Sequence, residues 1–168
     1  MNRNKVLSTI DRALEHHRAG RLDEAARTYA DVCRAAPRFF DAWYLAGALA
    51  FQRGGHGREA IDLLTRALRL KPDSAECKLF LGMALADAGR HAEAEKPLRA
   101  AVQKLPGFAE AWENLANVAC ALGRTNEGIE HLRRALVLQP GRSDIRQRLD
   151  VLLAGRETAE AVARVAVA

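Results

Sequence analysis

The stretch that decides the fold runs from residue 109 to residue 140 and reads AEAWENLANVACALGRTNEGIEHLRRALVLQP. Gly123 divides it into two segments, because glycine enters the left-handed backbone conformation most easily. Pro140 ends the second segment, since proline cannot donate the next helical hydrogen bond. Apolar residues at spacings of three and four predict one helix in each segment, with its own apolar stripe. The stripes are Trp112, Leu115, Ala116 and Ala119, and then Ile129, Leu132, Ala135 and Leu136.

The same pattern recurs upstream, where prolines close successive segments. They stand at Pro37, Pro72, Pro106 and Pro140, with gaps of 35, 34 and 34 residues. A period in this range is typical of arrays of stacked helical hairpins, in which each unit covers the apolar face of the next. We therefore expect four two-helix units, at about residues 3–37, 38–72, 73–106 and 107–140.

These residues resemble the tetratricopeptide repeat (TPR) family, whose helix–turn–helix unit follows the pattern W-x2-L-G-x2-Y…A-x3-F…A…P. The fourth unit matches it with Trp112, Leu115, Ala116, Ala119, Gly128, Leu132, Ala135 and Pro140. The third unit matches it with Leu81, Gly82, Leu85, Ala94, Leu98, Ala101 and Pro106. The resemblance covers about residues 6–140. It implies an all-α fold, a right-handed α-solenoid of four hairpins plus a C-terminal capping helix.

A further amphipathic segment follows the fourth unit. It begins at Ser143 and carries Ile145, Leu149, Leu152 and Leu153 on one side. Because a repeat array needs a terminal helix to cover its last apolar face, we expect a cap at residues 143–154. Gly155 is expected to end this helix. The array would then span residues 1–154, with residues 155–168 as a tail or linker.

Composition narrows the class of protein. Cys33, Cys77 and Cys120 are far apart and form no C-x2-C motif, which predicts reduced thiols in packed helices of a cytoplasmic protein. The sequence contains no run of about eighteen apolar residues, so it predicts no membrane span. The N-terminal residues lack the continuous apolar segment of a secretory signal.

No group of residues in the sequence predicts catalysis. The chain contains neither H-E-x-x-H nor G-x-S-x-G, and its carboxylates are scattered beside arginines. His16 and His17 are adjacent, so they point in different directions on a helix and do not form a metal pair. We therefore expect no enzymatic activity, no catalytic, cofactor-binding or metal-binding residues, and no cofactor.

The charge distribution raises one alternative partner, nucleic acid. The chain has a formal net charge of +5, and arginines crowd its C-terminal third. Glu127, Glu130, Asp144 and Asp150 are interspersed among them, and no aromatic stacking platform accompanies them. The pattern favours a solvated helix face over a nucleic-acid site. The arginines in question are Arg124, Arg133, Arg134, Arg142, Arg146, Arg148 and Arg156.

The resemblance also implies a binding surface, because the first helix of each TPR hairpin lines a concave groove. Six large apolar side chains fall on the groove positions of the second and third units, and two asparagines on those of the fourth. They are Tyr44, Leu45, Phe51, Leu79, Phe80, Met83, Asn114 and Asn117. The apolar group exceeds what a monomer usually exposes. A partner would cover it; the alternatives are a wider core, self-association, or cover by the tail at Val162 and Val165.

The expected function is that of a scaffold or adaptor that binds a partner peptide or helix in this apolar groove. The chaperone-type TPR clamp for a peptide carboxylate is absent, since Leu45, Glu76 and Phe80 stand at three of its places. The alternative is a regulatory or substrate-docking module of a larger enzyme, such as a glycosyl- or sulfotransferase. The segment Trp112-Glu-Asn-Leu-Ala-Asn is similar to the asparagine-lined arrays of those enzymes.

Overall fold

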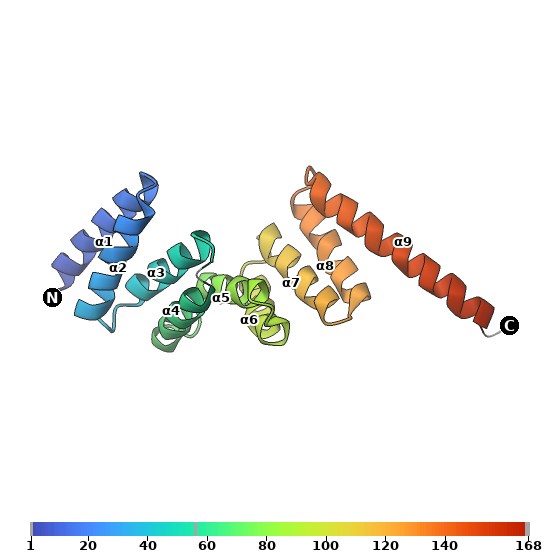
Figure 1. Cartoon of the computed structure of the whole chain (residues 1–168), viewed down its shortest axis with the longest axis horizontal. Helices are drawn as coiled ribbons and strands as arrows, with labels where there is room; N and C mark the ends of the chain where they lie inside the picture. Colours follow the sequence, from blue (N-terminus) through green and yellow to red (C-terminus); the bar gives the residue numbers. More distant parts are fainter. Residues whose placement is uncertain (1, 56, 167–168) are drawn as a thin grey trace. The chain divides into compact units, whose positions relative to one another are not determined.

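The computed structural model describes residues 2–55 and 57–166, with side chains described as far as Thr158. All regular secondary structure in this part of the chain is α-helical, which confirms the all-α prediction (Figure 1). The helices are α1 (Arg3–Arg18), α2 (Leu22–Ala35), α3 (Phe40–Gln52), α4 (Gly57–Leu70), α5 (Ala75–Asp87), α6 (His91–Lys104), α7 (Ala109–Ala121), α8 (Thr125–Leu138) and α9 (Ser143–Ala166).

Glycines close three of the hairpin turns, and the turn at Gly123 confirms the prediction made for it. Gly20, Gly89 and Gly123 have φ angles of +73°, +73° and +77°, a region that other residues enter only with strain. In each turn the amide that follows the glycine donates to the helix carbonyl five residues before it, over 2.9 Å; Arg124 thus donates to Ala119. This is the Schellman arrangement, which satisfies the carbonyls at the end of the first helix.

The chain forms two compact units, residues 1–97 and residues 98–168, and the boundary falls within α6 beside Pro97. In the first unit, α1 packs on α2, α2 on α3, α3 on α4 and α4 on α5. Small residues allow the helices to approach closely. A Cβ atom added to Gly47 of α3 would lie 2.6 Å from Cγ of Leu64 on α4, so the interface there has no room for a larger residue.

In the second unit, α7 packs on α8 and α8 on α9. Ala116, Leu132, Ala135 and Ile145 are fully buried together at this end of the chain, and Leu149 and Leu152 of α9 pack beside them. Helix α9 therefore covers the last apolar face, which confirms the predicted capping helix.

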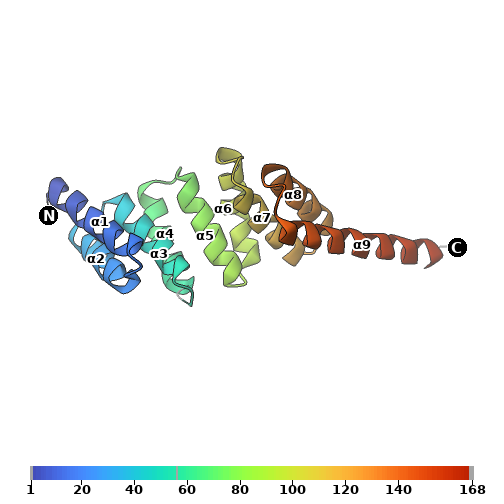
Figure 2. The same ribbon diagram turned by 90° about the horizontal axis from the view of Figure 1, so that it is seen from above.

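The prediction that α9 ends at Gly155 was wrong, because the helix continues to Ala166 (Figure 2 shows it extending beyond α8). Gly155 does not adopt a positive φ angle, and the hydroxyl of Thr158 donates to its carbonyl oxygen over 2.8 Å. A single glycine inside a helix costs only about 1 kcal/mol relative to alanine. Ala154 and Arg156, which flank Gly155, are good helix formers and favour continuation. The expectation that Val162 and Val165 cover the groove lies outside the described side chains.

Candidate functional site

Helices α3 and α5 bring four aromatic rings together in the first unit. The rings of Phe40 and Tyr44 stack with their centroids 5.7 Å apart. Phe80 meets Tyr44 edge to face at 5.9 Å, and it meets Phe51 in the same way at 6.1 Å. Offset and edge-to-face contacts at these distances are the favourable geometries for aromatic pairs. All four side chains are only half-buried. We call them the aromatic cluster.

Of the predicted groove residues in this unit, five remain at the surface and one does not. Leu45 and Met83 are half-buried, as are Tyr44, Phe51 and Phe80. Leu79 is only 3% exposed, so the prediction that it lines a surface was wrong. Helix α5 packs against both α3 and α4, and it therefore buries a wider arc than a single stripe. Its apolar residues surround the helix, so their spacing could not show which of them face water.

Charged groups border the aromatic cluster. The ammonium group of Lys71 lies 5.3 Å from the centroid of the Phe40 ring, within the range of a cation–π contact. Burial raises the pKa of Tyr44, and the nearby Glu76 carboxylate raises it further. The tyrosine hydroxyl therefore stays neutral and available as a hydrogen-bond donor. Glu76 and Asp41 are exposed, so the cluster has an apolar centre and a charged border.

The two predicted asparagines lie in the second unit, where they contact their own chain. Nδ2 of Asn114 donates to the carbonyl of Glu110 over 2.8 Å. Oδ1 of Asn117 accepts a hydrogen bond from Arg148 of α9. Each asparagine thus makes one hydrogen bond within its own chain, and its role in binding a partner's backbone stays a prediction.

Arg142, just before α9, and Arg148 of α9 also neutralise Glu113 on α7. Arg142 approaches the Glu113 carboxylate to 2.9 Å and Arg148 to 3.6 Å. Arg142 also pairs with Asp144 at 2.7 Å and holds the pKa of that carboxyl at about 2. The sequence pattern predicted a solvated face for these arginines and did not indicate the contacts. The available signal was the repeat register, which places Arg148 at the position that Phe80 holds in the repeat at residues 73–106.

A different aromatic contact stabilises the second unit on the other side of α7. The rings of Trp112 and His131 lie 5.6 Å apart, and Glu127 of α8 forms ion pairs with Arg99 and Arg124. Burial lowers the pKa of His131, and the Glu127 carboxylate opposes that shift. His131 is therefore neutral in the folded protein near pH 7.

The cysteines are poor nucleophiles in this structure. Cys33 and Cys77 are buried free thiols, and burial raises the pKa of each to about 12. Because the thiolate is the reactive form, neither thiol is activated for chemistry. In the described residues, no group of three or more His, Cys, Asp or Glu side chains is placed to hold a metal ion.

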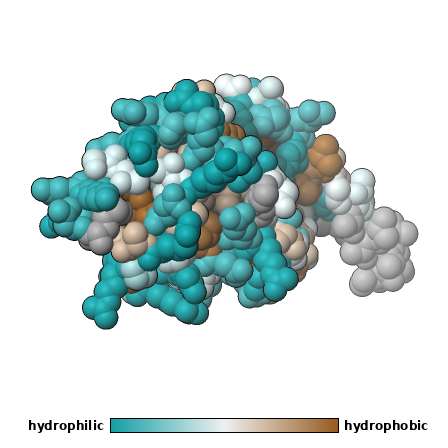
Figure 3. Space-filling view, turned by 60° about the vertical axis from the view of Figure 1, so that its left-hand side comes forward, coloured by the Kyte–Doolittle hydropathy of each residue, from teal (hydrophilic) through white to brown (hydrophobic). Residues whose placement is uncertain are grey.

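Hydrophobic surface is divided into separate patches on the face shown in Figure 3, with hydrophilic residues between them. None of the described helices combines the length and the apolar composition needed to cross a membrane.

Known proteins with the same repeat pattern are similar to this chain over most of its length. Tetratricopeptide repeat models match residues 10–75, 46–107 and 85–149. Human tetratricopeptide repeat protein 7A is 30% identical over 118 residues, which are 70% of this chain and 14% of that protein. The TPR repeat-containing thioredoxin TTL4 of Arabidopsis thaliana is 34% identical over 87 residues, 52% of this chain and 13% of that protein. The chain thus spans only a small part of these relatives.

Solved structures show the same fold. MamA (residue 41 to the end) from Desulfovibrio magneticus RS-1 has a TM-score of 0.84 and 21% identity, covering 95% of this chain and 90% of that one. A thermophilic TPR protein of Thermus thermophilus has a TM-score of 0.64 and 22% identity, covering 84% and 78%. Together with the matched repeat models, these findings show that the chain belongs to the tetratricopeptide repeat family.

Proposed function

We propose that the chain is a protein-interaction scaffold that binds an apolar segment of its partner on the aromatic cluster, with Leu45 and Met83 beside it. TPR repeats are protein-binding modules, which supports the general role. The observation that carries the specific surface is that Phe40, Tyr44, Phe51 and Phe80 contact one another yet stay half-exposed. Internal packing of the α3/α4 hairpin rests on other residues of the two helices, such as Gly47 and Leu64.

The partner segment is an amphipathic helix or an extended strand with large apolar side chains. Aromatic rings that are already packed together lose little conformational freedom on binding, so most of the buried area strengthens the complex. Lys71, Asp41 and Glu76 border the apolar centre and select the charges that flank the partner's apolar residues. Two expectations stay predictions: that the protein binds partners without catalysing a reaction, and that it is cytoplasmic.

A second candidate is a docking module of a larger enzyme. One observation favours it: the TPR repeat-containing thioredoxin TTL4 combines, by its name, such repeats with a thioredoxin, and this chain matches only 13% of its length. In that case the aromatic cluster would hold the enzyme's substrate protein rather than a free-standing partner. Both candidates use the same surface, and they are separated by whether the natural partner is a substrate that is chemically modified.

The test begins with peptides selected from a random library on the intact chain. Their affinity is then measured for Tyr44→Ala and Phe80→Ala. We expect each substitution to weaken binding by about tenfold, because an aromatic anchor contributes roughly 1–3 kcal/mol. Glu113→Ala is the matched control, since Glu113 holds the position of Tyr44 two repeats further along the chain. Equal affinity of all three variants, each with unchanged helical content, would exclude the aromatic cluster as the binding surface.

A further inference from the structure

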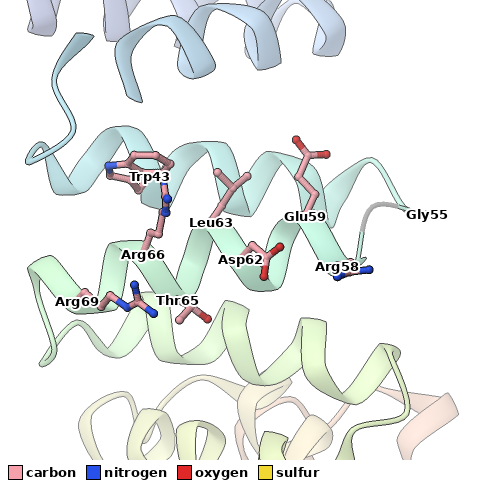
Figure 4. Close-up of a pocket in the computed structure, with 9 residues that line it drawn as sticks. All are labelled: Trp43, Gly55, Arg58, Glu59, Asp62, Leu63, Thr65, Arg66 and Arg69. Carbon is pink, nitrogen blue, oxygen red and sulfur yellow. The ribbon is translucent and has the colours of Figure 1, made fainter. Parts of the chain in front are cut away.

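The first unit has a second surface feature, which the proposed function does not use. A hollow of about 790 Å³ lies along α4 and is bordered by Trp43 of α3 and by Gly55 (Figure 4). Trp43 and Tyr44 are neighbours on α3, about 100° apart around the helix axis, so they serve different surfaces. The Trp43 indole is held in place, because its N–H donates to the carbonyl of Pro37 over 3.0 Å.

Three arginines of α4 line this hollow, and none of them is neutralised by the described residues. They are Arg58, Arg66 and Arg69. No described carboxylate lies within 4.0 Å of their guanidinium nitrogens. Arg66 instead lies over the Trp43 ring, with its guanidinium carbon 4.9 Å from the ring centroid. In Figure 4 the side chain of Arg69 lies beside Thr65, at the end of the hollow where Arg66 and Trp43 also lie.

Elsewhere in the chain, exposed arginines often pair with carboxylates. Arg34 pairs with Asp31 at 2.5 Å, Arg90 with Glu93 at 2.7 Å and Arg133 with Glu130 at 2.6 Å. Asp62 also lines the α4 hollow, yet within the described part of the chain it closes no ion pair with these arginines. The hollow therefore keeps three guanidinium groups that form no ion pair with a described carboxylate.

The equivalent region of the second unit is built differently. Trp112 takes the place of Trp43, and it is covered by His131, the residue in the place of Leu63. The position of Arg69 is held by Val137, which is 68% exposed. Nearby, the Glu127 carboxylate forms ion pairs with Arg99 and Arg124. The tryptophan anchor thus recurs, whereas of the three α4 arginines only Arg66 has an arginine at its repeat position in α8, which is Arg134.

The surface continues from the hollow toward α2. A second hollow of about 200 Å³ shares Trp43, Glu59 and Leu63 with the first and is bordered by Ala26 and Ala30 of α2. Small side chains there leave room for the backbone of a bound segment. The two hollows together offer a path for several residues of an extended chain.

We propose that the α4 hollow is a second docking surface, which binds an acidic segment of a protein partner. Carboxylates of that segment would pair with Arg66 and Arg69, and its backbone would lie along Trp43 toward Ala30. A protein fits better than a nucleic acid, because Glu59 and Asp62 would repel a continuous phosphate backbone. A peptide carries separate charges that avoid them.

The test measures binding of a fluorescein-labelled peptide of alternating aspartate and alanine, about twelve residues long, to the intact chain by fluorescence polarisation. We expect binding that weakens as NaCl rises, and a loss of about tenfold or more in the variant R66E/R69E. The matched control is R133E/R134E on α8, which changes the net charge equally and places Glu at the repeat position of Arg66. This control should stay within about twofold of the parent chain.

Three results would overturn the proposal: no measurable peptide binding, equal losses in the two variants, or tighter binding of a single-stranded oligothymidine that R66E/R69E abolishes. If R66E/R69E fails to fold, Arg69→Gln replaces it, because its substitution leaves the contact between Arg66 and the Trp43 ring in place. Arg69→Gln should weaken the peptide several-fold, and an unchanged affinity would contradict the proposal. Tyr44→Ala should leave this peptide's affinity unchanged, so that the two surfaces are tested separately.

Discussion

Two pairs of helices in this chain present the same repeat positions with opposite chemistry. Tyr44 of α3 and Phe80 of α5 meet ring to edge with centroids 5.9 Å apart. Two repeats further along the chain, the same positions hold Glu113 of α7 and Arg148 of α9, whose charged atoms are 3.6 Å apart. The first pair exposes apolar surface, whereas the opposite charges of the second pair neutralise each other. The hairpin backbone therefore does not depend on these positions, and they are free to determine what each unit binds.

The tryptophan of each unit shows the complementary case, a position that the fold does require. The indole N–H of Trp43 donates to the Pro37 carbonyl over 3.0 Å, and that of Trp112 donates to the Pro106 carbonyl over 2.9 Å. This hydrogen bond ties the closing proline of one hairpin to the first helix of the next. Only the group that covers the indole differs, Arg66 in one unit and His131 in the other.

The largest expected effect comes from weakening the packing of α9, the helix that holds Arg148 against α7. Ile145 is fully buried, whereas Val151 on the same helix is 65% exposed. Ile145→Ala should lower the free energy of unfolding of the second unit by about 3 kcal/mol, through lost burial and a cavity. Val151→Ala should change it by less than about 0.5 kcal/mol. Urea unfolding followed by circular dichroism measures both, and equal effects would show that α9 does not pack as described.

The second prediction compares the two pairs directly. Phe80→Ala removes two ring contacts from a half-buried site and should lower stability by about 2 kcal/mol. Arg148→Ala removes an ion pair in which the arginine side chain is 45% exposed, and should cost less than about 1 kcal/mol. Repeating the unfolding at high salt should shrink only the Arg148 effect. A salt-dependent Phe80 effect would contradict the apolar description of that pair.

The third prediction concerns Gly128 and Cys120, which replace Ala60 and Phe51 at the same repeat positions. A Cβ atom at Gly128 would lie 2.3 Å from Sγ of Cys120 and 3.2 Å from the carbonyl oxygen of Ala116. Gly128→Ala should therefore destabilise the protein by about 1 kcal/mol, although alanine favours a helix. Adding Cys120→Ala should restore part of that loss. Stabilisation by the single substitution, measured by thermal unfolding, would contradict this packing.

The smallest expected effect is a pH dependence confined to the second unit. Burial places the pKa of His131 below its usual value of 6.5, so the unfolded chain binds a proton that the folded chain excludes. Its contribution to stability is present above about pH 6.5 and falls as the solution is acidified through the lowered pKa. Unfolding free energies at about pH 7.5 and 5.5 should differ by less than about 1 kcal/mol. His131→Phe should remove that difference; a difference that persists would assign it to other groups.

Sequence reasoning was sufficient for the fold because the relevant constraints are local. The spacing of the closing prolines, the turn glycines at Gly20, Gly89 and Gly123, and the apolar stripes each restrict a few residues of backbone. The end of α9 was missed because continuation past Gly155 depends on small differences in helix propensity, which a single residue does not decide.

The candidate sites depend on contacts between helices, and there the sequence was less informative. Leu79 and Phe80 look equally apolar, yet α5 turns Leu79 into the core and leaves Phe80 half-exposed. Arg148 and Arg66 look equally basic, yet one pairs with Glu113 and the other covers Trp43. Adjacent residues on a packed helix differ in burial according to where the neighbouring helices lie, and the linear pattern does not contain that position.

We propose above all that the first unit, and not the second, binds the partner segment, and that it does so on α3 and α5. Leu45 and Asn114 occupy the same repeat position and are both half-buried, so each can be replaced by the photo-crosslinking residue p-benzoylphenylalanine. The measurement is the yield of crosslinked product when each variant is irradiated with a library-selected peptide at saturation. The account predicts a crosslink from position 45 and little or none from position 114. A crosslink from position 114 without one from position 45 would contradict it.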